Sequence, residues 1–341
     1  MSPNEENQLA IVIPAYKAHF LRQALKSISQ QTDKRFTVYV GDDASPDDIK
    51  GICEEFVDRF DLVYKRFNEN QGRDSLVAHW HRCIELSSGS WIWLFCDDDI
   101  MEPRCVEMFY KTIELTNGRF KVLRFNTLTI DDNGKVTRIN PIHPEIESGI
   151  GFIVSRLKGE RASFVTEYIF SRETYIENGG IIEFPLAWAS DDASWLTFSQ
   201  KEGILTIQGA KVRWRSGAYN ISPPGPKYQT MRIEAAFKFV NWLDNFIQIN
   251  GTGDPNLTSD KIHELSTKWF LQQFRSITPI RITNYKKFSR FINATTKKGW
   301  VFSYKFLLII DIAFRTHKFF KSRNNPIYRI LEKGGRILFH Y

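Results

Sequence analysis

The stretch WIWLFCDDD, residues 91–99, decides the fold class of this 341-residue chain. Its first six residues are apolar without interruption, which is typical of a strand buried on both faces at the centre of a parallel sheet. Three aspartates, Asp97, Asp98 and Asp99, follow at the carboxyl end of that predicted strand. Ligands of open α/β sheets bind outside the carboxyl ends of the strands. We therefore expect an α/β fold with a ligand site at these aspartates.

The residues before this stretch alternate between strand and helix patterns. Apolar runs predict strands over residues 9–14 (LAIVIP), 36–41 (FTVYVG) and 61–67 (DLVYKRF), and apolar residues at helical spacing lie between them. One of these helices should begin with Ser45 as its N-cap and Pro46 at its first position. The alternation is typical of βαβ units and predicts a Rossmann-like, mostly parallel central sheet flanked by helices.

The residues after the aspartates show a weaker alternation. A further strand is predicted over residues 120–127, whereas residues 128–162 have the composition of a loop-rich excursion. The motif PPGP at residues 223–226 is the strongest breaker in the chain and marks a candidate domain boundary. We expect an α/β domain over residues 1–222 and a helical, basic and aromatic-rich C-terminal extension over residues 223–341.

The net charge of +7 conceals a division into an acidic and a basic part. From Lys261 to Tyr341 there are 17 Lys and Arg residues against 3 Asp and Glu residues, so this segment carries +14 and the preceding residues carry −7. An acidic part with clustered aspartates suits a metal-assisted site, whereas a basic, aromatic segment suits an anionic surface such as lipid headgroups. We expect no nucleic-acid partner.

The C-terminal segment contains the apolar run FLLIIDIAF, residues 306–314. This run is shorter than the roughly 20 residues that a membrane-spanning helix requires, and Asp311 interrupts it. Two interpretations stay open: the surrounding basic and aromatic residues bind an anionic membrane surface, or a helical subdomain packs its apolar face on the α/β domain. The N-terminus, MSPNEENQ, lacks a signal-peptide pattern. We therefore expect a cytoplasmic protein, free or peripherally bound to the inner face of the membrane.

The three consecutive carboxylates predict a cation. Their mutual repulsion raises their pKa values unless a positive charge neutralises them. Oxygen ligands of this kind favour Mg²⁺ or Mn²⁺, which keep open positions for phosphate oxygens. The four cysteines form no CxxC pair and no cluster with histidines, which argues against a zinc site or a disulfide framework. The alternative to a cation site is a solvated acidic turn at a strand end.

Three motifs in fixed order carry a family resemblance. They are IPAYKAHFLRQALKSISQQT at residues 13–32, GDDASPDD at residues 41–48 and FCDDDIMEP at residues 95–103. Together they resemble glycosyltransferase family 2, the inverting, nucleotide-sugar-dependent enzymes with the GT-A fold. The resemblance covers residues 9 to about 110, and a weaker match, including GGIIEFPLAWASDDASW at residues 179–195, continues to about residue 222. It implies that residues 1–222 form a catalytic GT-A domain.

The resemblance implies a nucleotide site at the end of the first strand and in the D-D-x-S turn. Pro14, Ala15 and Tyr16 would border the nucleotide, and Asp43 would accept a hydrogen bond from the uracil or another base. Arg73 would reach the diphosphate or the base. The alternatives are that Tyr16 caps the sheet edge, that Asp43 bonds turn amides and that Arg73 is a surface residue.

The resemblance also divides the acidic motif. Cys96 stands where many relatives have the first aspartate, so Asp98 would be the direct metal ligand, for Mn²⁺ or Mg²⁺. Asp97 would contact the ribose or a ligand water. Asp99 would either ligate the metal or hold the loop.

An inverting transfer requires a carboxylate that removes the proton of the acceptor hydroxyl as that oxygen attacks the anomeric carbon. The resemblance implies Asp192 as this base, with Asp191 as the alternative; an ordinary acidic helix start after Ser190 is the competing interpretation. Trp188 and Trp195 would stack on sugar rings, or pack in the core. The segment VRWRSGAYNIS, residues 212–222, has no histidine for the metal, which leaves diphosphate or acceptor contact to Arg215.

The function that follows is transfer of a sugar from a nucleoside-diphosphate sugar, expected to be UDP-linked, to a glycan or lipid-linked acceptor in surface polysaccharide biosynthesis. Two alternatives stay open. A sugar-phosphate nucleotidyltransferase shares a similar sheet and acidic site but usually has a Gly-rich N-terminal loop, which IPAYKAHF lacks. A catalytically degenerate module would bind or assemble glycans. The sequence leaves the donor sugar and the acceptor undecided.

Overall fold

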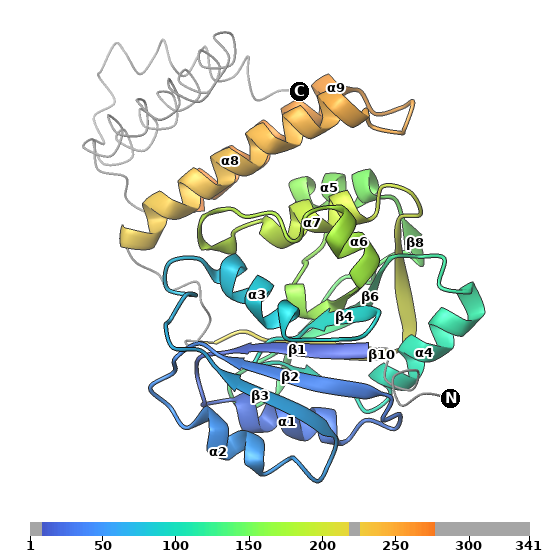
Figure 1. Cartoon of the computed structure of the whole chain (residues 1–341). Coiled ribbons are helices and arrows are strands. Elements are labelled where there is room, and N and C mark those ends of the chain that lie inside the picture. The colour runs from blue at the N-terminus through green and yellow to red at the C-terminus, as the bar shows by residue number, and fades with distance from the viewer. Residues whose placement is uncertain (1–8, 218–225, 277–341) are drawn as a thin grey trace. The chain divides into compact units, whose positions relative to one another are not determined.

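A computed structural model describes residues 9–217 and 226–276 of the chain, and within them one mixed sheet is flanked by helices (Figure 1). The strands are β1 (Leu9–Ala15), β2 (Phe36–Asp42), β3 (Asp61–Arg66), β4 (Trp91–Leu94), β5 (Ile100–Met101), β6 (Val122–Ile130), β7 (Val136–Ile139), β8 (Ile146–Glu147), β9 (Tyr168–Ser171) and β10 (Ile204–Arg215). The α-helices are α1 (Leu21–Ser29), α2 (Ile49–Glu54), α3 (Leu76–Glu85), α4 (Cys105–Thr116), α5 (Gly149–Lys158), α6 (Arg172–Glu177), α7 (Ser190–Phe198), α8 (Pro226–Asn250) and α9 (Ser259–Ser276). Two 3₁₀ turns, η1 (Val165–Glu167) and η2 (Pro185–Ala187), complete the elements.

The N-terminal half of the sheet is parallel, as the sequence predicts. Strand β1 pairs in parallel with both β2 and β4, and β2 pairs in parallel with β3. Helix α3 lies on one side of these strands, and α1 and α2 lie on the other (Figure 1). The carboxyl ends of β1, β2 and β4 therefore meet at one edge of the sheet, which confirms the predicted α/β class.

The remainder of the sheet is mixed. The strand order is β3-β2-β1-β4-β9-β6-β10-β5, and β9 runs antiparallel to both of its neighbours, β4 and β6. Strand β10 then returns parallel to β6, and the short β5 pairs antiparallel with β10. Strand β5 directly follows the acidic loop, so its pairing with β10 anchors the end of that loop to the second half of the sheet.

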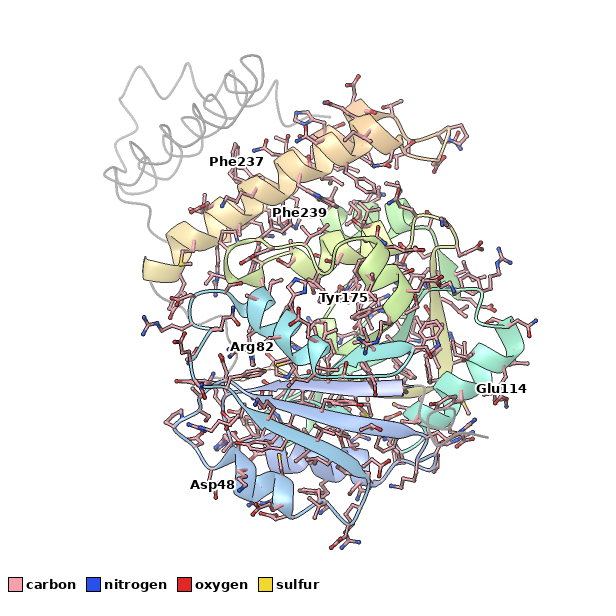
Figure 2. All side chains as sticks on the ribbon, in the orientation of Figure 1. Asp48, Arg82, Glu114, Tyr175, Phe237 and Phe239 are labelled. Atoms are coloured by element: carbon pink, nitrogen blue, oxygen red, sulfur yellow. The ribbon has the colours of Figure 1, made fainter. Side chains whose placement is uncertain are left out.

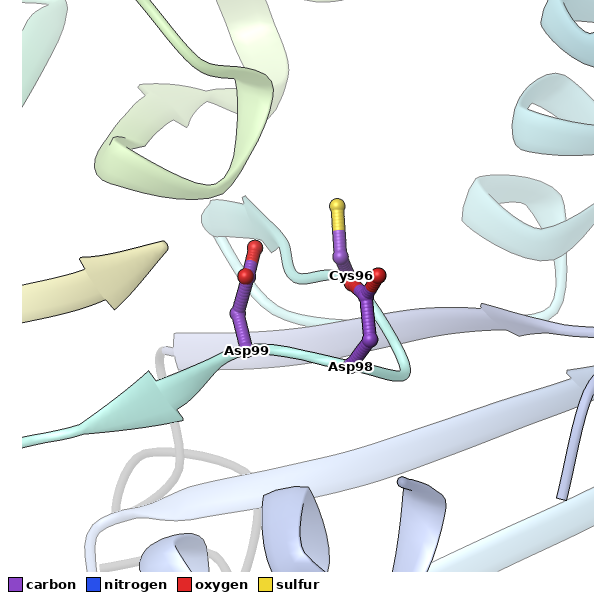
Figure 3. A group of neighbouring side chains, drawn as sticks. All are labelled: Cys96, Asp98 and Asp99. Carbon is purple, nitrogen blue, oxygen red and sulfur yellow. The ribbon is translucent and has the colours of Figure 1, made fainter. Parts of the chain in front are cut away.

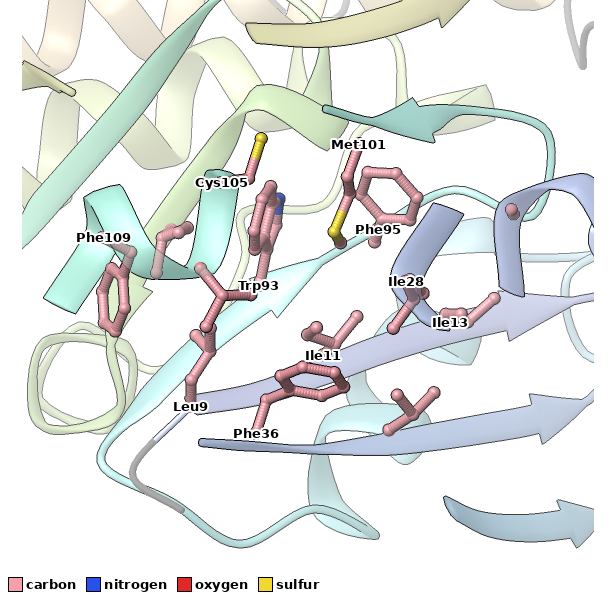
Figure 4. Packing of buried hydrophobic residues seen from close by; sticks show 14 of the residues in the cluster. Leu9, Ile11, Ile13, Ile28, Phe36, Trp93, Phe95, Met101, Cys105 and Phe109 are labelled. Carbon is pink, nitrogen blue, oxygen red and sulfur yellow. The ribbon is translucent and has the colours of Figure 1, made fainter. Parts of the chain in front are cut away.

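Aromatic and aliphatic side chains pack together in the core around β4 (Figure 4). All four residues of β4 are buried, which confirms the predicted central strand. The Trp93 ring stacks on Phe125 with the centroids 5.2 Å apart, and its Nε1 donates to the carbonyl of Thr166 at 2.8 Å. The indole is thus buried without leaving its N–H unsatisfied, as large core tryptophans require.

Two local predictions were wrong. Helix α2 begins at Ile49, and its N-cap is Asp48, whose carboxylate accepts from the Gly51 amide at 2.8 Å. The Ser45 hydroxyl instead holds the turn before the helix: it accepts from the Asp47 amide at 3.0 Å and donates to the Tyr16 carbonyl at 2.6 Å. The predicted loop over 128–162 contains β7, β8 and α5. Helix α5 is capped by Ser148, whose hydroxyl accepts from the Gly151 amide.

Helix α8 packs on the α/β body through aromatic residues. The Phe184 ring lies 6.0 Å from Phe239 and 6.2 Å from Trp242, measured between centroids, and the compact unit that holds the sheet extends to Trp269. Among the described helices, none is both long and apolar enough to cross a bilayer. The predicted apolar run at 306–314 lies outside the described residues, and a domain boundary at residue 222 stays a prediction.

Candidate active site

A cavity of about 580 Å³ opens at the carboxyl ends of β1, β2 and β4. Its walls come from the end of β1 with the loop after it, the turn after β2, the loop before α3, α3 itself and the loop after β4. The predicted residues Pro14, Tyr16, Asp43, Arg73 and Asp97 all line it. Five residues from four separate segments of the sequence thus meet at the edge of the sheet where ligands of this fold class bind.

Asp97 joins the acidic loop to the end of β1. Its Oδ2 accepts hydrogen bonds from the backbone amides of Tyr16 at 3.2 Å and Lys17 at 3.4 Å. Ala15, by contrast, is fully buried, and its carbonyl accepts from the Asp43 amide at 2.9 Å. The Ala15 backbone therefore joins the end of β1 to the turn that contains Asp43.

Asp43 organises the loop before α3. Its carboxylate is buried and accepts from the amides of Gln71 and Gly72, each at 2.8 Å, and from the guanidinium of Arg82. A Cβ at residue 72 would lie 2.6 Å from Asp43 Oδ2, so this close approach requires glycine. Arg82, labelled in Figure 2, lies 3.8 Å over the Phe67 ring. Arg73, at the cavity mouth, is exposed.

Three side chains of the acidic loop gather in one place (Figure 3). One ligand atom each of Cys96, Asp98 and Asp99 lies within 4.8 Å of the other two. Asp99 is fully buried, and its Oδ1 accepts from the Arg215 amide at 2.7 Å. Its Oδ2 is buried without a hydrogen-bond partner of normal geometry among the described residues. An orphaned carboxylate oxygen beside a second carboxylate fits a divalent cation.

The electrostatics of this loop agree with that fit. Burial, followed by the charge of Asp98, raises the pKa of Asp97 to about 7 and that of Asp99 well above the usual carboxyl value. Burial likewise raises the pKa of Asp98, against the opposing influence of the Arg215 guanidinium. Carboxylates that are this costly to ionise together are stabilised by a cation placed between them.

Arg215 holds the acidic loop in place through hydrogen bonds of its side chain. It is almost fully buried, and its guanidinium donates to the carbonyl of Asp98 at 2.8 Å, to that of Asp131 at 2.7 Å and to Gln23 Oε1 at 2.9 Å. These bonds occupy donors that the sequence analysis assigned to a diphosphate or acceptor. In this structure Arg215 positions the loop, and a direct substrate contact from it stays a prediction.

The acidic pair opens α7, and its two members differ in environment. Asp192 is buried, and both of its oxygens accept from the Arg156 guanidinium, at 2.9 Å for Oδ1 and 3.1 Å for Oδ2. Asp191 is half-buried; burial and then the charge of Asp192 raise its pKa to about 7. Neither residue lines the cavity at the sheet edge.

The backbone that leads into α7 is strained. Leu186, Ala187 and Ala189 have φ angles of 60°, 52° and 62°, in the left-handed region that residues with a Cβ rarely adopt. Such conformations cost of order 1–3 kcal/mol each and cluster at functional sites. The strain places the acidic pair at the start of a helix whose first turn has no side-chain cap.

The two predicted tryptophans lie in different settings. Trp195 is fully buried and stacks on Tyr168 with the ring centroids 4.7 Å apart, so it packs as a core residue without the exposure that a stacked sugar requires. Trp188 is half-buried, and the Arg232 guanidinium lies 5.1 Å from its ring. Arg232 lies one helical turn from Tyr228, which lines the cavity.

Sequence reasoning missed two arginines, Arg82 and Arg156. Each pairs with a carboxylate from a distant segment, Asp43 and Asp192 respectively. The spacing of Arg82 on its predicted helix gives no sign of a partner 39 residues earlier. Arg156 lies in the segment predicted as loop, so its direction could not be inferred.

The mixed sheet, the cavity at its carboxyl edge and the acidic loop together define a domain of the GT-A class found in glycosyltransferases. Residues 10–166 match the sequence model of glycosyl transferase family 2, and this part of the chain belongs to that family.

Individual relatives agree with this assignment. Glycosyltransferase GlyA of Streptococcus pneumoniae is 30% identical over 109 residues, which are 32% of this chain and 15% of GlyA. An uncharacterized glycosyltransferase of Mycoplasma genitalium is 27% identical over 108 residues, 30% of this chain and 36% of the relative. The matched part thus spans little more than a third of these relatives at most.

Solved structures of S. aureus TarS share the fold. The TarS complex with UDP has a TM-score of 0.56 and 14% identity, with 84% of this chain and 78% of that chain covered. The TarS complex with UDP-GlcNAc has a TM-score of 0.56 and 15% identity, with 84% of this chain and 79% of that chain covered. At this identity the likeness supports the GT-A fold alone.

Proposed function

We propose that the protein is an inverting, metal-assisted glycosyltransferase that takes its sugar from a UDP-linked donor. The observation that carries the proposal is the convergence of the β1 end, the Asp43 turn and the acidic loop on one cavity of about 580 Å³. Cavities of about 300–1,000 Å³ hold ligands of the size of a nucleotide sugar. Binding of UDP and UDP-GlcNAc by TarS, a protein of the same fold, supports the choice of nucleotide.

The nucleotide end of the cavity is the side formed by Tyr16, Asp43 and Arg73. Tyr16 is 40% exposed and offers a ring face, and Arg73 offers a solvent-exposed cation. The buried Asp43 carboxylate already accepts from Gln71, Gly72 and Arg82, so a base would share these oxygens as a further donor. A base stacks on an aromatic ring and presents N–H donors to a carboxylate, whereas a diphosphate attracts a guanidinium. These three groups match the base and the diphosphate of a nucleoside diphosphate.

Asp98 and Asp99 would hold the cation, which we expect to be Mn²⁺ or Mg²⁺. When bound, such a cation supplies charge neutralisation for the leaving nucleoside diphosphate. The chain itself keeps the carboxylates in place: the Arg215 amide holds Asp99, and the Arg215 guanidinium holds the carbonyl of Asp98. The Tyr16 and Lys17 amides hold Asp97 toward the nucleotide side.

We assign the base to Asp191 and a positioning role to Asp192. A general base works best with a pKa near the working pH and with a carboxylate that is free to accept a proton. Asp191 has a pKa of about 7, whereas both Asp192 oxygens are bonded to Arg156. The acceptor hydroxyl would lie between α7 and the cavity, near Trp188. The acceptor itself is proposed to be a glycan or lipid-linked glycan of a surface polysaccharide.

Transfer and hydrolysis with a panel of nucleotide sugars, with Mn²⁺ and with EDTA, test the function. We expect turnover of a UDP-sugar that EDTA abolishes, and a product of inverted anomeric configuration by NMR. Asp98→Ala should lose metal-dependent UDP binding in calorimetry. The matched control is Asp58→Ala, because Asp58 is exposed and lies outside the cavity lining. Metal-dependent UDP binding and turnover that survive unchanged in Asp98→Ala would refute the metal assignment.

A further inference from the structure

The acidic loop contains a donor that an all-oxygen cation site does not use, the thiol of Cys96. The thiol is half-buried and lines the cavity, as Asp98 does, while Asp99 closes the group from its buried side. Figure 3 shows the three side chains extending from one turn of the loop to the same side. The other cysteines, Cys53, Cys83 and Cys105, are all buried.

The spacing of these three donors suits one ion. Their ligand atoms lie within 4.8 Å of one another. Metal–sulfur bonds of about 2.3 Å and metal–oxygen bonds of about 2.0–2.2 Å allow donors on opposite sides of one ion to lie about 4.4 Å apart. Asp99 Oδ2 supplies an independent sign of a ligand, because it is buried and has no hydrogen-bond partner of normal geometry in the described part of the chain.

We propose that Cys96 is a direct metal ligand and that the site therefore binds borderline and soft divalent cations, such as Zn²⁺, Co²⁺ and Cd²⁺, more tightly than Mn²⁺ or Mg²⁺. Binding replaces the S–H bond of Cys96 by a metal–sulfur bond and releases one proton to solvent, with no change of oxidation state. Thiolate ligands select softer metals, whereas carboxylates suit Mg²⁺ and Mn²⁺. The inference rests on the proposed metal-assisted function for its biological meaning.

Cd²⁺ binding to the full-length protein is the test, because a cadmium–thiolate bond gives an ultraviolet charge-transfer absorption that carboxylates do not give. The chelator-treated wild type should show this absorption with a stoichiometry of one ion. Cys96→Ser should lose it, and Cys96→Asp should also lower the preference for Cd²⁺ over Mn²⁺ by about tenfold or more. The matched control is Cys53→Ala, which removes a buried thiol far along the sequence and should retain the absorption.

A second measurement does not depend on the folding of a variant. In the wild type, Cys96 should be the most reactive of the four thiols toward a small alkylating reagent, because the other three are buried, and bound Cd²⁺ should protect it. The reagent is applied at alkaline pH, since burial and the neighbouring carboxylates raise the pKa of the Cys96 thiol and only the thiolate reacts. Cd²⁺ that binds without the absorption, or no Cd²⁺ binding, overturns the proposal, as does an absorption that persists in Cys96→Ser. If the protein transfers sugar with Mn²⁺ but Cd²⁺ gives no charge-transfer absorption, the thiolate ligand is refuted and the proposed function stands. If Cd²⁺ gives the absorption but no sugar is transferred, the proposed function is refuted and the thiolate ligand stands.

Discussion

The pH dependence of sugar transfer is expected to report the ionisation of Asp191. Its pKa of about 7 means that about a tenth of the residue is ionised at pH 6. At saturating Mn²⁺, log kcat/KM should rise with a slope of one up to about pH 7 and then level. Because kcat/KM reports the free enzyme, the structure without substrate is the relevant reference. Asp191→Asn should lower the plateau by about 10²–10⁴ and remove the slope.

Two neighbouring substitutions should move this transition in opposite directions. The charge of Asp192 raises the pKa of Asp191, whereas that of Arg156 lowers it. Asp192→Asn should therefore shift the acidic limb to lower pH, and Arg156→Gln should shift it to higher pH, each by about one unit, at the low end of the range for neighbouring charges. Arg156→Lys keeps the charge and should restore the wild-type profile.

Two results would contradict this account of Asp191. If Asp192→Asn abolishes transfer as Asp191→Asn was expected to do, while Asp191→Asn retains the wild-type limb, the base is Asp192. Shifts of the limb in the same direction for Asp192→Asn and Arg156→Gln would contradict the electrostatic reasoning itself. Circular dichroism at each pH separates these outcomes from unfolding, because breaking the Asp192–Arg156 pair leaves a buried carboxylate unpaired.

Three other predictions concern stability and membrane binding. Trp195→Ala should destabilise the fold by about 3–5 kcal/mol in denaturant unfolding, and Trp195→Phe by clearly less; an unchanged unfolding midpoint with weakened sugar binding would show that Trp195 is not a core residue. Burial raises the pKa of Glu167 from 4.5 to about 8, so the wild-type protein loses stability as the pH rises through that window. The side chain of Glu167→Gln does not titrate, so the thermal midpoint of this variant relative to wild type should increase from pH 5 to pH 8. A constant difference between the two midpoints would contradict this prediction. The 14 excess positive charges after residue 260 predict sedimentation with anionic vesicles at low salt and release at high salt, whereas no binding at low salt removes the membrane proposal.

The central strand and its aspartates were predictable from local sequence. An uninterrupted apolar run has one stable place in an α/β sheet, and the residues after it must emerge at the ligand-binding edge. The D-D-x-S turn after β2 followed from the same rule, since parallel neighbours end at the same edge. For this reason the sequence predicts Asp43 and Asp97 at one edge of the sheet, and both line the cavity.

Pairing between distant segments was not predictable. Asp192 forms an ion pair with Arg156, which lies 36 residues earlier in the sequence. The Arg215 guanidinium donates to carbonyls that lie 84 and 117 residues earlier. Neither contact leaves a periodic signal, because each depends on how helices and strands are laid against one another. The antiparallel insertion of β9 between β4 and β6 escaped prediction for the same reason.

The sequence by itself determined the fold class, the family resemblance and the location of the acidic loop, because these depend on residue order along one strand and its end. Only the tertiary structure decided which carboxylates are free. In the folded chain Asp192 forms an ion pair, Asp191 has a raised pKa and Trp195 lies in the core. Burial and partner choice set these properties, and both arise only when segments far apart in the chain pack together.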